Sequence, residues 1–289
     1  MTPQQILDTI GKHELWLQHQ QGGARANLAG LNLSGLHLNQ INLQSAKLSG
    51  ANLSRTIMAG TDLSYCDMFC ANLDSADFRN AMLLRADMRG ARVRGANFTG
   101  ADLTKVDLRG GAMVASIASG SPTLMRSDLS NSAMDEATLR SANLSGADLS
   151  NCTMVGANLE NALLCGALLS GANLSGAKLK GADLSGANLS DASLEGAELA
   201  GANLAGAILN NTRLQRADLM GANLESIDLG KADLTGAKLS RSEKSLSRPV
   251  REILRDHHTR ITDGGRRGAR AQLIKADLSF VDFGEINLS

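Results

Sequence analysis

The sequence predicts an all-β solenoid, and three observations carry this prediction. Leucine recurs at every fifth position with a strict phase, from Leu139 and Leu144 as far as Leu239. The residue two places before each leucine is small and usually alanine, as in Ala142 and Ala147. Asp or Asn often precedes the leucine and Ser-Gly often follows it, so the unit reads Ala-(Asp/Asn)-Leu-Ser-Gly. A short unit repeated in this way indicates a fold in which copies of one element stack on each other.

A period of five fits neither an α-helix nor one continuous strand. In a helix the leucines would rotate around the axis, and in a strand they would alternate between the two faces. All of them can point the same way only if the chain turns a corner in every unit. Short strands then wind around an axis with leucine and alanine inside, and successive coils stack at about 4.8 Å. Glycine tolerates the corner dihedral angles, and Asp or Asn can bond to the nearby backbone.

The unit resembles that of the pentapeptide-repeat family. The resemblance implies a right-handed quadrilateral β-helix in which four units make one coil. Counting every fifth residue gives 18 centres from Leu28 to Met113 and 24 from Leu124 to Leu239, so the repeat region 24–240 covers most of the chain. This prediction is specific for the fold. It says little about function, because function lies in surface sites that the repeat does not define.

Segments outside the repeat predict one helix at each end. Residues 1–23 are expected to form an N-terminal capping helix, with Trp16 as its anchor on the first coil. Residues 241–270 are expected to form a linker and a second helix, because their apolar residues have the same spacing. The two apolar stripes are Ile6, Ile10, His13 and Leu17, and Val250, Leu254, His257 and Ile261. Residues 271–289 then supply one further coil, which must stack on the rod or on another subunit.

One internal defect interrupts the repeat at residues 114–123. Met113 and Leu124 are 11 residues apart where two units would use ten. One extra residue in a β structure predicts a bulge or a short outward loop. Pro122 supports a local disruption, because proline cannot donate to a β-ladder.

Composition argues against several classes of partner. The 29 basic and 29 acidic residues balance, which disfavours both a polyanion-binding protein and a strongly acidic mimic of nucleic acid. Aromatic residues make up only 2% of the chain, too few for base-stacking platforms, so nucleic acid is not an expected partner. No apolar run approaches the ~18 residues of a membrane span, and the N-terminus has no signal-peptide pattern. We therefore expect a cytoplasmic protein without membrane attachment.

No pattern indicates a catalytic, metal or cofactor site. Cys66 and Cys152 fall in the inward alanine slot, and Cys70 and Cys165 fall at outward positions. The Cys66-x-x-x-Cys70 spacing has no second pair to complete four metal ligands, so filling of space is the preferred interpretation. Phosphate-loop, nucleophile-elbow and zinc-protease patterns are absent from the sequence. A rod without a cleft also lacks the pocket that most enzymes need, and we expect neither catalysis nor a cofactor.

Basic residues 20 positions apart should stack on adjacent coils if four units make a coil. Two such pairs form the one basic cluster, which is the candidate interaction surface: Arg85 over Lys105, and Arg89 over Arg109. Asp87 and Asp107 lie between the two rows. A self-neutralising ladder on a solvated face is therefore the favoured alternative to a phosphate site.

The leading functional hypothesis is a non-enzymatic scaffold that binds a protein partner. It includes a homodimer formed through the C-terminal helix and coil. The alternative comes from the resemblance: a nucleic-acid mimic that binds a type II topoisomerase, as quinolone-resistance members of the family do. The balanced charge and the basic cluster argue against a mimic, which needs a long acidic face.

Overall fold

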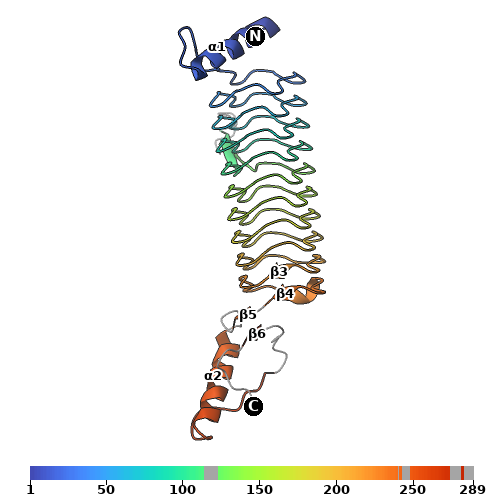
Figure 1. Cartoon of the computed structure of the whole chain (residues 1–289). Helices are drawn as coiled ribbons and strands as arrows, with labels where there is room; N and C mark the ends of the chain where they lie inside the picture. Colours follow the sequence, from blue (N-terminus) through green and yellow to red (C-terminus); the bar gives the residue numbers. More distant parts are fainter. Residues whose placement is uncertain (114–122, 240, 243–247, 274–280, 283–289) are drawn as a thin grey trace.

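A computed structural model describes residues 1–113, 123–239, 241–242, 248–273 and 281–282 of the chain. Helix α1 (Pro3–Leu17) lies across one end of a long stack of coils, and helix α2 (Arg248–Thr262) lies beyond the other end (Figure 1). The chain ascends neither in a bundle nor in a flat sheet. It winds as one elongated rod, so almost all of its surface is the outside of the stack.

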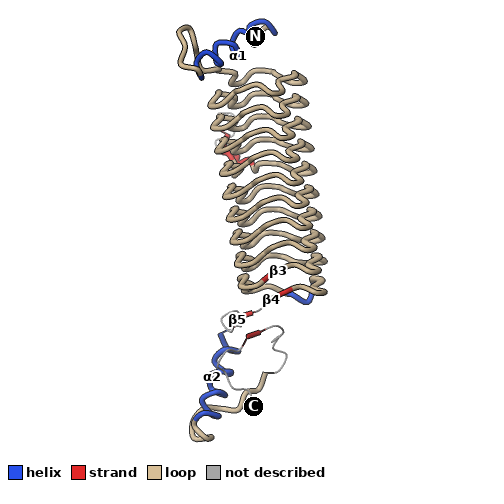
Figure 2. The backbone as a smooth tube through the Cα atoms, viewed as in Figure 1, coloured by secondary structure: helices blue, strands red, loops and turns tan. Residues whose placement is uncertain are grey.

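Parallel β-bridges define the coil. One circuit consists of the bridges Asn27↔Lys47, Asn32↔Asn52, His37↔Ile57 and Asn42↔Asp62. Each bridge joins residues 20 apart, and the next bridge starts five residues later, so four units make one coil as predicted. Each unit contributes a single bridging residue, which explains why most of the rod is drawn as loop in Figure 2.

The last coil of the rod contains the longer elements. Strand β3 (Asp218–Leu219) pairs in parallel with strand β4 (Lys238–Leu239), again 20 residues apart. A short 3-10 helix, η1 (Leu229–Lys231), begins after Asp228, whose side chain accepts the Gly230 N–H at 3.1 Å. The ladder therefore continues to Leu239 in the register set by the first coil.

The interior of the rod is a continuous apolar core. The predicted centres and the alanines two places before them are buried along the stack, for example Ala162 and Leu164 at 0% exposure. Larger centres are accommodated in the first half, where Phe78 and Phe98 on adjacent coils stack with ring centroids 4.8 Å apart. Each coil buries apolar surface against the next, so stability is a sum of nearest-neighbour terms.

The corner residue two places after each centre adopts a left-handed backbone. At Gly100, with φ of 68°, this conformation costs little because glycine has no Cβ. A Cβ added there would lie 2.5 Å from the Asn80 side-chain oxygen on the preceding coil. Other corners carry bulky side chains in the same conformation, among them Arg85 with φ of 54°.

Helix α1 closes the first coil. It begins at a capping box in which Thr2 and Gln5 satisfy each other's backbone N–H groups. Ile6 is buried in the rod core and Ile10 packs against it, as the apolar stripe predicts. Trp16, the expected anchor, is not buried: it stays 37% exposed and stacks on the buried His13 ring at 5.4 Å.

The internal defect is larger than the one extra residue that the sequence suggests. Strand β1 (Gly111–Met113) pairs antiparallel with strand β2 (Thr123–Met125), so the chain leaves the coil as a hairpin. The bridge Asp107↔Asn143 spans 36 residues instead of 20, which places 16 inserted residues between the coils. Met113 and Leu124 were therefore wrongly counted as centres. The buried centres on either side are Leu108 and Leu129, and residues 114–122 lie outside the described part.

The C-terminal segment repeats part of the N-terminal arrangement. Strand β5 (Arg241–Ser242) pairs in parallel with strand β6 (Val281–Asp282), directly after the last coil of the rod. Within helix α2, Leu254 is fully buried. The expected coil centres after residue 273 lie outside the described residues. No helix in the described part of the chain is long and apolar enough to cross a membrane.

Candidate interaction surface

The four predicted basic residues occupy two neighbouring columns of the rod. Arg89 and Arg109 directly follow the buried centres of one face, and Arg85 and Lys105 occupy the preceding corner. Adjacent coils are joined at both columns, by Gly90 N–H to Arg109 C=O at 2.9 Å and Arg85 N–H to Thr104 C=O at 3.0 Å. The stacking expected from the 20-residue spacing is therefore present.

Arg89 and Arg109 are neutralised by their own aspartates. Arg89 donates to both carboxylate oxygens of Asp87 at 2.8 and 2.7 Å, and Arg109 holds Asp107 in the same way at 3.0 and 2.8 Å. Partial burial alone would raise the pKa of Asp87, but the hydrogen bonds from Arg89 outweigh it and lower that pKa. The Arg89 guanidinium also lies over the Phe69 ring at 5.5 Å. This half of the basic cluster matches the ladder interpretation.

Arg85 and Lys105 differ from the other pair. Both are exposed, and neither has an ion pair or a side-chain hydrogen bond with any described residue. Their corners belong to adjacent coils, about 4.8 Å apart at strand spacing. Two uncompensated positive charges therefore lie side by side at one edge of the rod.

Apolar side chains surround these two cations. Tyr65 occupies the same corner one coil earlier and is 45% exposed. Its N–H donates to the Leu84 carbonyl at 2.8 Å, and Met82 on the adjoining strand is 46% exposed. We call this surface the corner patch: Tyr65, Met82, Leu84, Arg85 and Lys105. Aromatic, Met and Arg side chains are the types enriched at protein interfaces.

Backbone strain marks the same corner. Tyr65, Arg85 and Lys105 have φ of 59°, 54° and 57°, in the left-handed region that disfavours bulky residues. Many equivalent corners relieve this cost with glycine. Strain kept in three successive coils points to a role for the side chains outside the fold. Sequence reasoning missed Tyr65 and Met82, although large residues in a slot that usually holds glycine were a usable signal.

Metal and thiol chemistry find no support in the described part of the chain. It contains no group of three or more His, Cys, Asp or Glu side chains that could hold a metal ion. Cys66 and Cys152 are buried, and each thiol donates at 2.9 Å to a backbone carbonyl of the preceding coil. They fill alanine slots, as the sequence indicates.

Comparison with known proteins decides the family. The description "Pentapeptide repeats" matches eight copies, in overlapping segments within residues 24–69, 71–110 and 124–236. The chain belongs to the pentapeptide-repeat family. Its members are right-handed quadrilateral β-helices, the architecture that the 20-residue parallel ladder repeats here. No protein of curated function matches the chain.

Several solved pentapeptide-repeat structures resemble the chain. HetL from the cyanobacterium Nostoc sp. strain PCC 7120, which is involved in heterocyst differentiation regulation, is 32% identical; the match covers 77% of this chain and 90% of HetL, with a TM-score of 0.40. QnrB1, a plasmid-mediated fluoroquinolone resistance protein, is 22% identical over 59% of this chain and 87% of its own, with a TM-score of 0.40. Rfr23 from the cyanobacterium Cyanothece 51142 is 26% identical over 52% and 88%, with a TM-score of 0.22.

Proposed function

We propose that this pentapeptide-repeat protein is a non-enzymatic scaffold that binds a protein partner through the corner patch. The observation that supports it is the pair of unpaired cations, Arg85 and Lys105, next to the exposed Tyr65 and Met82. Elsewhere on the rod, the basic column of Arg89 and Arg109 is already neutralised. An uncompensated and partly apolar edge has more to gain from a partner than a neutralised one.

The chemistry of the corner patch favours a partner segment that carries both acidic and apolar side chains. A carboxylate can accept hydrogen bonds from Arg85 or Lys105, while an apolar side chain covers Met82 and Leu84. Asp62 and Asp102 lie on the strands above and below Met82, but each oxygen acceptor used there bonds the backbone of its own turn at 2.9 Å. The local aspartates thus hold corners and leave the two cations unpaired.

Site-directed photocrosslinking tests this proposal. A photoreactive residue replaces Met82 in one protein and Met220 in a matched control, since the two side chains are 46% and 48% exposed on the same face. In native lysate we expect a defined adduct from position 82 that is lost with Arg85→Gln and weakens at high salt. Equal adducts from both positions, or an adduct insensitive to Arg85→Gln, would contradict the corner patch.

We also propose self-association through helix α2 and the terminal coil. Leu234 and Leu239 in the last coil of the rod are only partly buried, whereas the first coil is covered by α1. Light scattering on a size-exclusion column should give a dimer for the full chain and a monomer for a chain truncated at residue 240. Two monomers would mean that the C-terminal segment closes its own rod.

The nucleic-acid mimic is the weaker alternative. A mimic needs a long acidic face, and the aspartate column Asp67, Asp87 and Asp107 carries Arg89 and Arg109 on two of its three members. A gyrase supercoiling assay with and without a quinolone separates the two functions. Inhibition or protection at micromolar protein would favour the mimic over the scaffold.

A further inference from the structure

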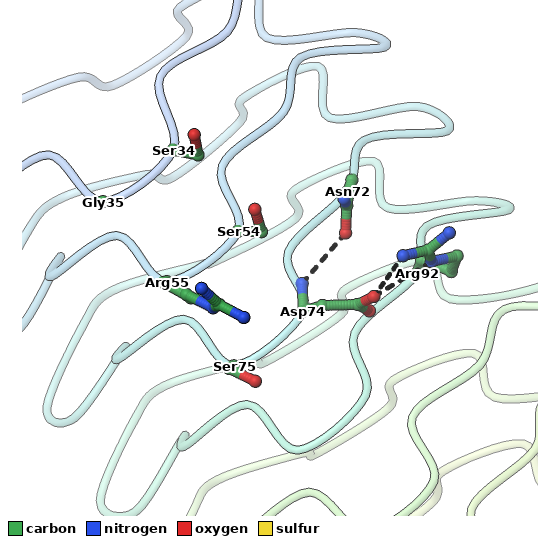
Figure 3. Close-up of a pocket in the computed structure, with 8 residues that line it drawn as sticks. All are labelled: Ser34, Gly35, Ser54, Arg55, Asn72, Asp74, Ser75 and Arg92. Carbon is green, nitrogen blue, oxygen red and sulfur yellow. Dashed lines mark hydrogen bonds and ion pairs between the residues drawn. The ribbon is translucent and has the colours of Figure 1, made fainter.

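A second surface of the rod contains a polar hollow of about 550 Å³ beside the first four coils (Figure 3). It is lined by small hydroxyl side chains and two arginines: Ser34, Ser54, Ser75, Arg55, Arg92 and the carboxylate of Asp74. The hollow exists because small residues occupy the corner positions above longer side chains. It lies on a different face from the corner patch.

The wall of the hollow is held by an asparagine ladder. Asn52 donates its side-chain N–H to Asn32 at 3.0 Å, and Asn72 donates to Asn52 at 3.2 Å. Each amide oxygen also accepts a backbone N–H two residues later, for example Asp74 N–H to Asn72 at 3.1 Å. Because both the amide and the turn are fixed, the ladder is a rigid support rather than a mobile surface.

The next rung replaces asparagine with Arg92, which bridges to Asn72. Its guanidinium turns back to the Asp74 carboxylate and forms an ion pair with it. Asp74 also accepts the Arg94 N–H at 3.2 Å, so its oxygens are already used by donors of the protein. The one carboxylate of the hollow is therefore neutralised and is not a free ligand for a cation.

Arg55 is the unpaired group. Its backbone N–H donates to the Asp74 carbonyl at 2.8 Å, which fixes its corner beside the ion pair, and its φ is 58°. Its guanidinium has no ion pair or hydrogen bond with any described residue, and the hydroxyls of Ser54 and Ser75 have no such partner either. Figure 3 places Arg55 and Arg92 on opposite sides of Asp74.

We propose that the polar hollow binds a phosphate group. Two guanidinium groups against one carboxylate give the lining one net positive charge, and the free hydroxyls add neutral donors. Arginine with hydroxyl donors is a typical phosphate-binding set, because the planar guanidinium can donate two parallel hydrogen bonds to oxyanions. A neutral sugar would leave Arg55 without a counter-charge, and a cation would meet no free carboxylate. This proposal does not depend on the proposed function.

Titration of the full-length protein, followed by NMR or calorimetry, tests the phosphate site. The probes are inorganic phosphate, the small monoester glycerol phosphate and a phosphoserine peptide with its unphosphorylated form. We expect Arg55→Gln to weaken phosphate binding by about tenfold or more, because it removes a charge-assisted donor. The matched control Arg85→Gln changes net charge equally at another left-handed corner without an ion pair, and should bind as the wild type does.

Asp74→Asn supplies the opposite change. It keeps an oxygen for the Arg94 N–H but releases the Arg92 guanidinium, so phosphate should bind several-fold more tightly. Stronger binding of the monoester points to a metabolite, and stronger binding of the phosphopeptide points to a modified protein. Equal affinity of wild type and Arg55→Gln, or no binding up to about 10 mM phosphate, overturns the proposal. Crosslinking at Met82 remains a separate readout, so failure of the hollow does not affect the corner patch.

Discussion

Nδ1 of His13 accepts a hydrogen bond from the backbone N–H of Ala26 at 3.1 Å, which joins helix α1 to the first coil. His257 and Ala271 form the same contact at 3.2 Å after helix α2. An imidazole accepts at Nδ1 only while that nitrogen carries no proton. Nε2 of His13 is buried and has no hydrogen-bond partner among the described residues. The N-terminal cap therefore requires neutral His13.

The first prediction is that acid destabilises the cap. Burial lowers the pKa of His13, so the unfolded chain binds more protons than the folded one below the ordinary pKa of about 6.5. Stability should thus be constant above that pH and fall as the pH drops below it. Thermal unfolding between about pH 8 and pH 5 measures this loss, which His13→Asn should reduce because Asn can accept without titrating. His19→Asn, at an exposed site, is the control. Identical pH profiles for wild type and His13→Asn would exclude the latch.

The second prediction compares two neighbouring leucines. Leu164 is a fully buried centre, and Leu163 beside it is 43% exposed. Leu164→Ala leaves a cavity between adjacent coils and should lower the free energy of unfolding by about 2–5 kcal/mol. Leu163→Ala should change it by less than about 0.5 kcal/mol. Chemical denaturation measures both values, and similar losses would mean that the inward and outward assignment is wrong.

The third prediction concerns backbone strain in the corner patch. Arg85→Gly removes a side chain from a left-handed corner and should stabilise the rod by about 0.5–1 kcal/mol, after the entropy gained by the unfolded chain is subtracted. Gly100→Ala should destabilise it by about 1–2 kcal/mol, because φ is 68° and the added Cβ meets Asn80. Melting temperatures report both changes. If Arg85→Gly destabilises the protein, the side chain contributes to the fold and the strain argument fails.

The fourth prediction separates the cysteines by reactivity. Burial raises the pKa of Cys66 to about 12 and the pKa of Cys152 to about 11. Thiolate is the reactive form, so neither residue should react with a thiol reagent at neutral pH while the protein is folded. Cys70 and Cys165 are only partly buried and should react first. Mass spectrometry after brief alkylation shows the order, and early labelling of Cys66 would mean that the coil opens locally.

The sequence predicts the coil well because inward and outward positions have different chemistry. Leucine at every fifth position can be buried only by a turn in each unit, and this fixes the 20-residue register seen from Asn27↔Lys47 onward. The self-neutralising pair of Arg89 and Asp87 follows from the same register. These features depend only on local spacing, which the sequence contains in full.

The hairpin and the corner patch depend on information that local spacing lacks. Gly111-Ala112-Met113 has the composition of a further unit, and only the pairing with Thr123–Met125 shows that it has left the coil. Tyr65 and Met82 are 17 residues apart and have no shared period. They meet because one corner and the next coil's strand are neighbours in space. Periodicity finds positions that repeat, so it overlooks a surface built from exceptions.

The ladder closes behind the β1–β2 hairpin as if the inserted residues did not exist. Asp107 bonds to the coil of Asn143 with the same parallel geometry as any other pair, so no load of the rod passes through the insertion. The length and sequence of that excursion are consequently free of the constraint that rules every other unit. In a molecule whose surface is otherwise dictated every five residues, the excursion is a vacant berth, where a foreign segment could be carried while the rod itself stays unchanged.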